Sequence, residues 1–409
     1  MRQAATKLLG IGCVVISILF FVFSSLSLVE GSSVATVPVG GTPFDMAITP
    51  DGKYVYVANF ENVLVINTAT NKVVATVVTE KSPIGIAITP DGKYAYVAHS
   101  TSEPPIASVI STATNTVVDT IALEHSAEKG IAITHDGKYV YMTNMEGWVM
   151  VISAETNKVI ENIFIAPRDP DWTDPDTGVT IPSLSDPRSV ALSPDDKYAY
   201  VGTSDFRVIV IDVSTNRIVK TIEVERGIWD IAVAPDGKHL YATTSDDKIF
   251  VIDTATAKVT ATLTGFGSPL GIAITSDGNY AYIPNNWNDT VLVLNTATNV
   301  VDKTITVGQG PRGVVFTPDG KHAYVTCDTD ASGANYAGTV WVLSTSEDST
   351  LSQATPQATP SAAEFPAQTL IISGLVIIVA ISAGIIFVKI KPMKKQSTKT
   401  QRMLTLPLS

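Results

Sequence analysis

The sequence of 409 residues carries 28 lysine and arginine and 39 aspartate and glutamate side chains, a formal net charge of −11. Such an acidic chain is a poor partner for nucleic acid, because phosphate backbones are bound mainly by clustered cations. Of its two cysteines, Cys13 lies in the apolar N-terminal stretch and Cys327 stands alone. An internal disulfide framework is therefore excluded, and the core must be held together by burial.

The first 31 residues have the pattern of a secretory signal peptide. Arg2 and Lys7 precede an almost uninterrupted apolar run from residue 8 to residue 28, and small residues follow at Gly31-Ser32-Ser33. We expect cleavage after Gly31. Because the run is long for a signal peptide, an uncleaved N-terminal anchor is the alternative.

Seven segments between residues 34 and 344 share one template, seen first at Thr49-Pro50-Asp51-Gly52-Lys53-Tyr54. The aspartates that open the seven copies are spaced 40, 45, 59, 41, 41 and 42 residues apart: Asp51, Asp91, Asp136, Asp195, Asp236, Asp277 and Asp319. A period near 40 built from short strands is typical of a propeller, and helical periodicity is absent. The sequence therefore predicts an all-β, seven-bladed β-propeller over residues 32–344.

Each repeat divides into four short strands, which in the first repeat are expected at residues 44–49, 54–59, 63–67 and 72–78. Asp51-Gly52 forms the turn between the first two, because glycine accepts the positive φ that a tight hairpin demands. Asp196 takes this place in the fourth repeat, and aspartate is one of the few other residues that tolerate left-handed geometry.

The last repeat ends with its third strand, at residues 339–343, and no fourth strand follows it. Residues 34–39 at the beginning of the chain match the fourth strand of the first repeat, residues 74–78. We therefore expect the N-terminal strand to complete the final blade, which leaves the ring with few open edges.

These repeats resemble the YVTN β-propeller repeat family, found in many microbial surface-layer-type proteins. The closest matches to its namesake motif are Tyr141-Met142-Thr143-Asn144 and Tyr56-Val57-Ala58-Asn59. The resemblance covers residues 34–344. It implies a WD40-like propeller at a microbial cell surface, and archaeal cells are among those implied. It says little about activity, because propellers of this type include binding proteins, lactonases and cofactor-dependent oxidoreductases.

The C-terminal part is expected to form a stalk, a membrane anchor and a short tail. Residues 345–369 are rich in Ser, Thr and Pro, which suits an extended stalk. Residues 370–388 form a charge-free stretch long enough for a transmembrane helix, and the tail at 389–409 is basic. The positive-inside rule then keeps the tail in the cytoplasm and displays the propeller outside the cell.

Two further features concern the processing of the C-terminal segment and the charge of the part expected outside the cell. Glu364-Phe365-Pro366 ahead of the apolar stretch resembles an archaeal C-terminal sorting signal, whose processing would replace the helix by a lipid. Between residues 32 and 388 there are 20 lysine and arginine against 38 aspartate and glutamate residues, a net charge of −18. That charge suits solubility outside a cell and disfavours anionic lipid as a partner.

Residues that enter the inner strand of each blade should surround the mouth of the central channel. By alignment of the repeats they are Phe44, Ile84, Lys129, Arg188, Trp229, Leu270 and Arg312, with Asp45 and Asp230 at the next position. Three cations, two aromatic rings and two carboxylates are the groups that bind an anionic or sugar-like ligand. The favoured interpretation is nevertheless that these groups merely satisfy one another in a polar channel, because the sequence shows no pocket.

The same face is expected to carry the departures from the template, at residues 100–105, 166–187 and 327–338. The second of these contains Asp169, Asp171, Asp174, Asp176 and Trp172, but it lacks the glycine and terminal glutamate of a calcium loop, so a solvated acidic loop is favoured. Trp172, Trp229 and Trp287 are candidates for stacking on sugars, whereas Trp148 and Trp341 are assigned to blade packing. Asn288 is the acceptor of the sequence's N-glycosylation motif.

No catalytic motif is present. The five histidines form no metal-spacing pair, and His135, His239 and His322 replace template residues. We expect no cofactor, no metal and no nucleic acid partner, and a non-enzymatic protein for binding, adhesion or a surface layer, with a glycan or another surface protein as ligand. The alternative is an extracytoplasmic enzyme, either a lactonase-like hydrolase or a cofactor-dependent oxidoreductase, for which Asp45, Asp230 and Lys129 are the candidates.

Overall fold

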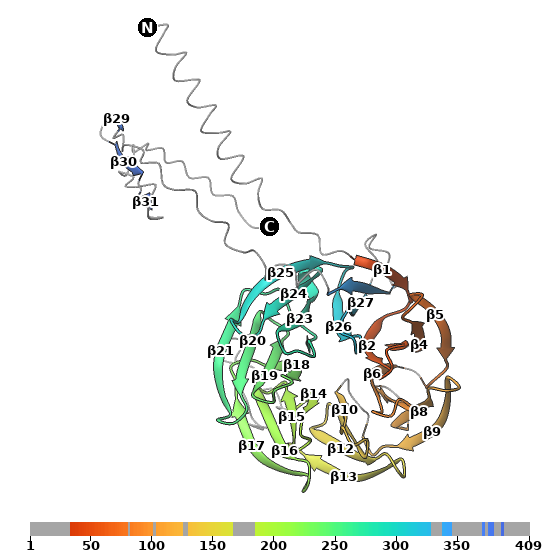
Figure 1. The fold of residues 1–409 in the computed structure, drawn as a ribbon. Coiled ribbons are helices and arrows are strands. Elements are labelled where there is room, and N and C mark those ends of the chain that lie inside the picture. The colour runs from red at the N-terminus through yellow and green to blue at the C-terminus, as the bar shows by residue number, and fades with distance from the viewer. Residues whose placement is uncertain are drawn as a thin grey trace, which may run out of the picture. The chain divides into compact units, whose positions relative to one another are not determined.

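The computed structural model describes residues 33–80, 82–100, 104–125, 130–166, 185–328 and 338–345, together with the backbone of 370–372, 375–379 and 386–387. In the first of its two compact units, residues 1–351, seven four-stranded antiparallel sheets lie around a central axis (Figure 1). The predicted seven-bladed β-propeller is confirmed.

Each blade is a meander in which the first strand is innermost and the fourth is outermost. Blade 1 consists of β2 (Pro43–Ile48), β3 (Tyr54–Asn59), β4 (Asn62–Asn67) and β5 (Lys72–Val77). Blade 2 consists of β6 (Pro83–Ile88), β7 (Tyr94–His99), β8 (Ile106–Ser111) and β9 (Thr116–Ala122). Blade 3 consists of β10 (Ile131–Ile133), β11 (Tyr139–Thr143), β12 (Trp148–Ser153) and β13 (Lys158–Phe164).

The second half of the ring repeats this order. Blade 4 consists of β14 (Pro187–Leu192), β15 (Tyr198–Thr203), β16 (Arg207–Asp212) and β17 (Arg217–Glu223). Blade 5 consists of β18 (Ile228–Val233), β19 (His239–Thr244), β20 (Lys248–Asp253) and β21 (Lys258–Thr264). Blade 6 consists of β22 (Ala273–Ile274), β23 (Tyr280–Asn285), the 3-10 turn η1 (Asn286–Asn288), β24 (Thr290–Asn295) and β25 (Val300–Thr306). Blade 7 consists of β26 (Pro311–Phe316), β27 (His322–Cys327), β28 (Thr339–Ser344) and β1 (Ser33–Pro38).

The ring closes as predicted, with the first strand of the chain serving as the outermost strand of the last blade. β1 pairs antiparallel with β28, in a register that runs from Ser33 opposite Leu343 to Pro38 opposite Thr339. Val37 of β1 is buried beside Val340 and Val342 of β28, in a cluster that also contains blade 1 residues. The pairing therefore joins the two ends of the propeller both by hydrogen bonds and by apolar packing.

The core lies between adjacent blades, because the second and third strands are buried on both faces. The largest fully buried side chains include one tyrosine from the second strand of each of six blades: Tyr56, Tyr96, Tyr141, Tyr241, Tyr282 and Tyr324. Their hydroxyls reach the next blade: Tyr96 donates to the side chain of Asn157 (2.7 Å), and Tyr324 donates across the closure to Asn71 (2.9 Å). Burial raises the pKa of Tyr96 to about 12, so this hydroxyl stays a proton donor at all ordinary pH values.

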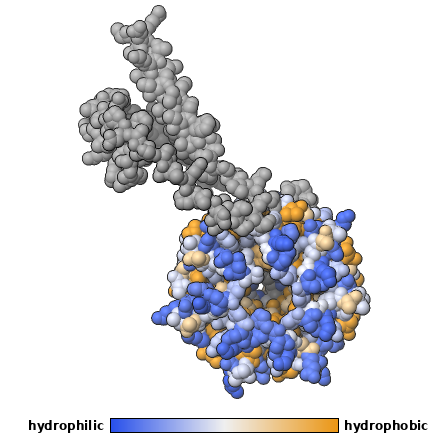
Figure 2. Space-filling model, viewed as in Figure 1, coloured by the Kyte–Doolittle hydropathy of each residue, from blue (hydrophilic) through white to orange (hydrophobic). Residues whose placement is uncertain are grey.

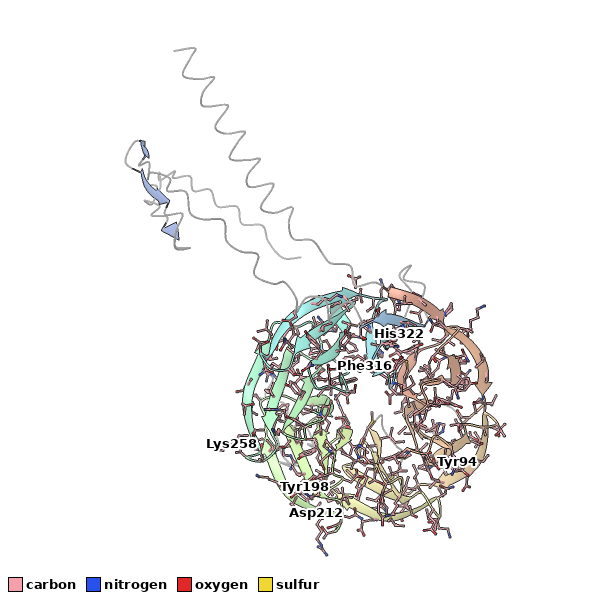
Figure 3. The ribbon with its side chains drawn as sticks, viewed as in Figure 1. Tyr94, Tyr198, Asp212, Lys258, Phe316 and His322 are labelled. Carbon is pink, nitrogen blue, oxygen red and sulfur yellow. The ribbon has the colours of Figure 1, made fainter. Side chains whose placement is uncertain are left out.

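In each blade a tight turn, usually Asp-Gly, connects the first strand to the second. These turns lie on one face of the disk, here named the turn face. Gly52 has a φ of 71°, and in blade 4 Asp196 accepts the same left-handed geometry with a φ of 54°. Tyr94, Tyr198 and His322 begin the second strands just after these turns, so the histidine occupies the place of the template tyrosine (Figure 3). Figure 2 shows hydrophilic groups that recur around the central opening of the disk.

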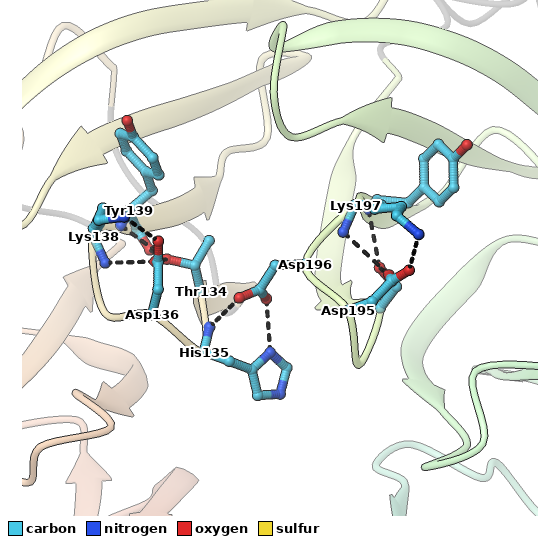
Figure 4. A network of polar contacts seen from close by, with 10 residues as sticks. Thr134, His135, Asp136, Lys138, Tyr139, Asp195, Asp196 and Lys197 are labelled. Atoms are coloured by element: carbon cyan, nitrogen blue, oxygen red, sulfur yellow. Dashed lines mark hydrogen bonds and ion pairs between the residues drawn. The ribbon is translucent and has the colours of Figure 1, made fainter.

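On the turn face, the proline of one turn packs against the glycine of the next turn. A Cβ added at Gly92 would lie 3.3 Å from Cδ of Pro50, and one added at Gly137 would lie 3.5 Å from Cδ of Pro90. The junction between blades 3 and 4 differs, because His135 and Asp196 replace the proline and the glycine. The Asp196 carboxylate accepts from the backbone N–H of His135 (2.7 Å) and contacts its Nδ1 (2.7 Å), as Figure 4 shows.

The second compact unit, residues 352–409, contains β29 (Leu370–Ile372), β30 (Leu375–Val379) and β31 (Ile386–Phe387), which pair in that order. The helix predicted over residues 370–388 is therefore not shown, and the remaining residues of that stretch lie outside the described part. Among the described residues, no helix has the length and apolar character needed to cross a membrane. The predicted signal peptide, residues 1–31, the stalk beyond Thr345 and the tail at 389–409 also lie outside the described residues.

Candidate functional site

The face opposite the turn face carries the connections between blades and the turns between second and third strands, and is here named the mouth face. These two sets of loops are joined by backbone hydrogen bonds. The N–H of Phe60 donates to the carbonyl of Thr42 (3.2 Å), and the N–H of Ser82 donates to the carbonyl of Phe60 (2.8 Å). These bonds join the described mouth-face loop of blade 1 to the connections on either side of it.

A β-bulge at the start of the inner strand sets the direction of the predicted mouth residues. The register between first and second strands shifts between Pro43 and Asp45, and equivalent shifts occur in blades 2, 4, 5 and 7. A bulge adds one residue that has no partner on the neighbouring strand and re-aims its side chain. The residues at these bulges are Phe44, Ile84, Arg188, Trp229 and Arg312, five of the seven that the alignment places at the mouth.

The structure brings four of these residues together in two equivalent pairs. The guanidinium of Arg188 lies over the ring of Trp229, 5.0 Å from its centroid, and that of Arg312 lies over the ring of Phe44 at 5.1 Å. In each pair the arginine belongs to one blade and the aromatic ring to the next, at the junctions of blades 4 and 5 and of blades 7 and 1. A cation over an aromatic face is a stabilising contact.

Each arginine is also paired with a carboxylate that the repeat alignment did not single out. Arg188 Nε lies 2.7 Å from Oδ2 of Asp186, and Arg312 holds both carboxylate oxygens of Asp328, at 2.7 and 2.8 Å. These partners lie just outside the template: Asp186 is two residues before its arginine, and Asp328 follows the second strand of blade 7. Both described mouth arginines are therefore paired with a carboxylate, and neither is an uncompensated cation.

The other predicted mouth residues do not converge on these pairs. Asp45 Oδ2 accepts from the backbone N–H of Ile86 in the next blade (3.3 Å), and Asp230 Oδ1 accepts from the N–H of Ile231 (2.9 Å). Ile84 and Leu270 are buried. Lys129, the third predicted cation, lies outside the described residues.

The base of the longest mouth-face loop is fixed by buried polar groups. Arg207 donates from a terminal nitrogen to the carbonyl of Ala166 (2.8 Å) and is paired with Asp205, and both side chains are nearly inaccessible. Ser185 donates to the carbonyl of Ile165. Trp172 and the four aspartates of this loop lie outside the described residues.

Two tryptophans differ sharply in their surroundings. Trp148, assigned to blade packing, lies between the stacked ring of His125 (5.1 Å) and the ring of Phe164 (4.7 Å), and His125 Nδ1 contacts Glu146 at 2.6 Å. Trp287, in η1 on the mouth face, is 73% exposed, and its neighbour Asn288, the predicted glycosylation acceptor, is exposed as well. The stacking of His125 on Trp148 could not be predicted from the repeat pattern, because His125 lies in a connection of irregular length.

Three recesses among the described residues lie away from the mouth. Recesses of about 350–490 Å³ lie between adjacent blades on the turn face, lined by turn residues such as Asp51, Pro50 and Asp91. In the part of the chain that the structure describes, no three His, Cys, Asp or Glu side chains are grouped to hold a metal ion.

The fold and the repeats together define the class of the molecule: it is a seven-bladed β-propeller repeat protein. The family described as "WD domain, G-beta repeat" matches residues 216–253, which run from β17 to β20. The LVIVD repeat family matches residues 46–66, 186–216 and 272–293, which lie in blades 1, 4 and 6. No curated protein sequence matches the chain.

Among solved structures, the chain is similar to hydrazine synthase of Kuenenia stuttgartiensis, with a TM-score of 0.63 and 23% sequence identity. The match covers 75% of this chain and 96% of the other. At this level of identity the likeness shows a shared propeller fold and nothing about chemistry.

Proposed function

We propose that the chain is a non-enzymatic cell-surface binding protein that recognises a glycan or another surface ligand with its mouth face, in adhesion or as part of a surface layer. The observation that carries this proposal is the pair of arginine–aromatic contacts at the mouth, Arg188 with Trp229 and Arg312 with Phe44. Aromatic rings beside polar donors are the groups with which proteins hold sugars and other polar ligands. Because both arginines are already paired with carboxylates, the mouth favours the sugar-like ligand over the anionic one.

Both ends of the described propeller lie on the face opposite the mouth. Ser33 and Leu343 are paired at the turn-face end of β1 and β28, and the N–H of Thr345 donates to the carbonyl of Lys321 in the last Asp-Gly turn (3.0 Å). Both ends therefore leave the propeller from the turn face. The mouth face is therefore free of the points at which the chain enters and leaves the propeller, which supports its use for binding.

The enzyme alternative finds less support in the geometry. Asp45 and Asp230 lie on blades 1 and 5; Asp45 accepts from the backbone N–H of Ile86 in blade 2, and Asp230 accepts from that of Ile231 in its own strand. A hydrolase needs an acid, a base or a metal that converge on one reacting atom. Turnover of lactone or ester substrates by the purified protein, lost on replacing either aspartate, would establish the enzyme in place of the binding protein.

The proposal is tested with the purified full-length chain on an array of microbial glycans. We expect a bound glycan whose signal falls at least about tenfold in Arg188→Ala or Trp229→Ala, since aromatic and arginine anchors dominate binding energies. Lys53→Ala, an exposed residue of the turn face, is the matched control and should leave the signal unchanged. Absence of any glycan ligand, or equal loss in the control, contradicts the proposal.

A further inference from the structure

The turn between the second and third strands of blade 6 carries three side chains that the fold itself does not account for. It contains η1 (Asn286–Asn288), then Asp289, then Thr290, the first residue of β24. The side chains of Asn286 and Asp289 bind backbone groups of the next connection and so hold the turn. Trp287, Asn288 and Thr290 have no such bond, and Asn288-Asp289-Thr290 is the one Asn-x-Ser/Thr motif of the sequence.

This turn is fixed by hydrogen bonds to the connections on both sides of blade 6. The backbone N–H of Trp287 donates to the carbonyl of Gly267, in the connection that precedes the blade (3.1 Å). Oδ1 of Asp289 accepts from the N–H of Gly310, in the connection that follows it (3.0 Å). The turn therefore presents the side chains of Trp287 and Asn288 in fixed directions on the mouth face.

Two of the three side chains are open to solvent. Trp287 is the most exposed aromatic side chain of the described residues, at 73%. Asn288 beside it is exposed, and its amide lies against Gly267, where an added Cβ would come within 2.7 Å of Nδ2. An uncovered indole leaves a large apolar area in contact with water, which is unfavourable. An acceptor amide and a ring that lacks a cover thus lie side by side.

The third side chain, Thr290, is explained neither by packing nor by hydrogen bonding. Its hydroxyl is buried and has no hydrogen-bond partner among the described residues. Arg207 and Lys248 begin the third strands of blades 4 and 5, so the fold needs no hydroxyl at this position. An unpaired buried hydroxyl lowers stability. Such a group is expected where its use precedes folding, and the threonine of an Asn-x-Thr motif is recognised on the unfolded chain.

We propose that Asn288 carries an N-linked glycan and that the first sugar of this glycan covers the indole of Trp287. The C–H groups of the sugar ring pack on the indole, which removes apolar area from water. Because the Thr290 hydroxyl is closed off in the folded chain, the glycan is attached before blade 6 folds. The inference uses the export of the chain, which the proposed function includes, and does not depend on any ligand at the mouth.

The donor of the glycan is a sugar carried on a lipid phosphate, used by a separate transferase during export. Nδ2 of Asn288 forms a bond to C1 of the first sugar, and the bond between C1 and the phosphate oxygen breaks. The lipid phosphate leaves with the electron pair of that bond and takes up the amide proton. The products are a glycosylated amide and a free lipid phosphate.

The modification is tested on the full-length protein and its variants, produced in the organism of origin, by mass spectrometry of peptides that span residue 288. We expect a sugar on Asn288 in the unaltered chain and in Thr290→Ser, and none in Thr290→Val or Asn288→Gln. Thr290→Val keeps the shape of the side chain and removes only the unpaired hydroxyl. Its midpoint of thermal unfolding should therefore be at least as high as that of Asn288→Gln, which lacks the same glycan.

The cover of Trp287 is tested by quenching tryptophan fluorescence with acrylamide. Quenching should be stronger in Asn288→Gln than in the unaltered chain. This difference should disappear when Trp287→Phe is introduced into both proteins, because Trp287 is the ring that the glycan covers. Equal quenching of the unaltered chain and Asn288→Gln would overturn the cover.

An unmodified Asn288 in the unaltered chain, or a sugar that persists in Thr290→Val, would overturn the inference as a whole. Binding to the glycan array, measured on the same proteins, keeps this outcome separate from the proposed function. An unmodified Asn288 with an array ligand overturns the inference and supports the proposed function. A glycosylated Asn288 without any array ligand does the reverse.

Discussion

At the scale of single residues, the most regular feature of the molecule is the hydrogen-bonded turn that comes after each inner strand. The hydroxyl of Thr89 donates to Oδ1 of Asp91 (2.7 Å), which also accepts from the backbone N–H of Lys93 (3.1 Å), while Oδ2 is paired with the Lys93 ammonium (3.0 Å). The same contacts recur around Asp51 and Asp136. This repetition explains why the Thr-Pro-Asp-Gly-Lys template is kept so closely.

Replacing Thr89 by alanine should raise the pKa of Asp91. The Thr89 hydroxyl is the largest cause that lowers this pKa from 3.8 to about 2, and the backbone and side chain of Lys93 lower it further. Because the folded pKa is depressed, the turn's contribution to stability is present above the ordinary pKa and is lost as the pH falls from 3.8 towards 2. Carboxyl titration by NMR measures the change, and an unaltered Asp91 value in Thr89→Ala contradicts it; Asp51 is the internal control.

Residue-scale contacts within one turn could be predicted from the sequence, whereas contacts between blades could not. Glycine and aspartate at the turn positions are required directly by the need for a positive φ. The pairing of Arg312 with Asp328 depends on how a connection outside the template folds back, and no spacing rule encodes that. For the same reason the pairing of Arg188 with Asp186 and of Arg312 with Asp328 was not predicted.

At the scale of elements, neighbouring blades are joined on the turn face by one small, repeated contact. Proline supplies a flat ring without an N–H, and glycine supplies the space that the ring fills, as at Pro50 and Gly92. At the junction of blades 3 and 4 both positions change together: His135 brings back an N–H, and Asp196 brings the carboxylate that accepts from it. Two simultaneous departures that satisfy each other indicate a specific pair.

Exchanging this pair for the template should show coupling between the two sites. His135→Pro alone leaves the Asp196 carboxylate without its two partners, and we expect a loss of about 1–2 kcal/mol in the free energy of unfolding. Asp196→Gly alone removes the acceptor but relieves a positive φ of 54°. The double variant should regain the proline–glycine contact and be more stable than the sum of the single changes by about 1 kcal/mol. Urea unfolding measures all three, and strict additivity would contradict the pairing.

Strand positions were the most predictable property of the elements. The four strands expected in the first repeat differ by at most one residue at either end from β2, β3, β4 and β5. Alternation and turn residues are local signals, so they locate strands well. The inner-strand bulges were not predicted, because an extra residue in one strand is defined only by its partner strand. Those bulges are what direct Arg188 and Trp229 towards each other.

At the scale of the whole molecule, the ring depends on a strand borrowed from the opposite end of the chain. The closure was predicted correctly because a missing fourth strand at one end and a spare strand at the other are both visible in the repeat pattern. The chain beyond residue 345 has no repeat pattern to offer such a signal. Its expected helix over 370–388 belongs to a segment whose described residues form short strands.

A variant that lacks residues 33–38 should lose much of its stability and become prone to association. Its β28 would present an unpaired edge, and Val340 and Val342 would lose their packing against Val37. Thermal unfolding and light scattering measure the two effects. A synthetic peptide of residues 33–38 should restore part of the stability by adding back the strand. A variant as heat-resistant and monodisperse as the intact chain would contradict the closure.

The position of β28 also determines how the molecule responds to tension. The chain leaves the propeller directly from the end of this strand, which is hydrogen-bonded along its length to β27 on one side and to β1 on the other. A pull on the C-terminal end of β28 along the strand axis must therefore shear both ladders at once and cannot unzip them bond by bond. Such a strand resists extension far better than an edge strand would.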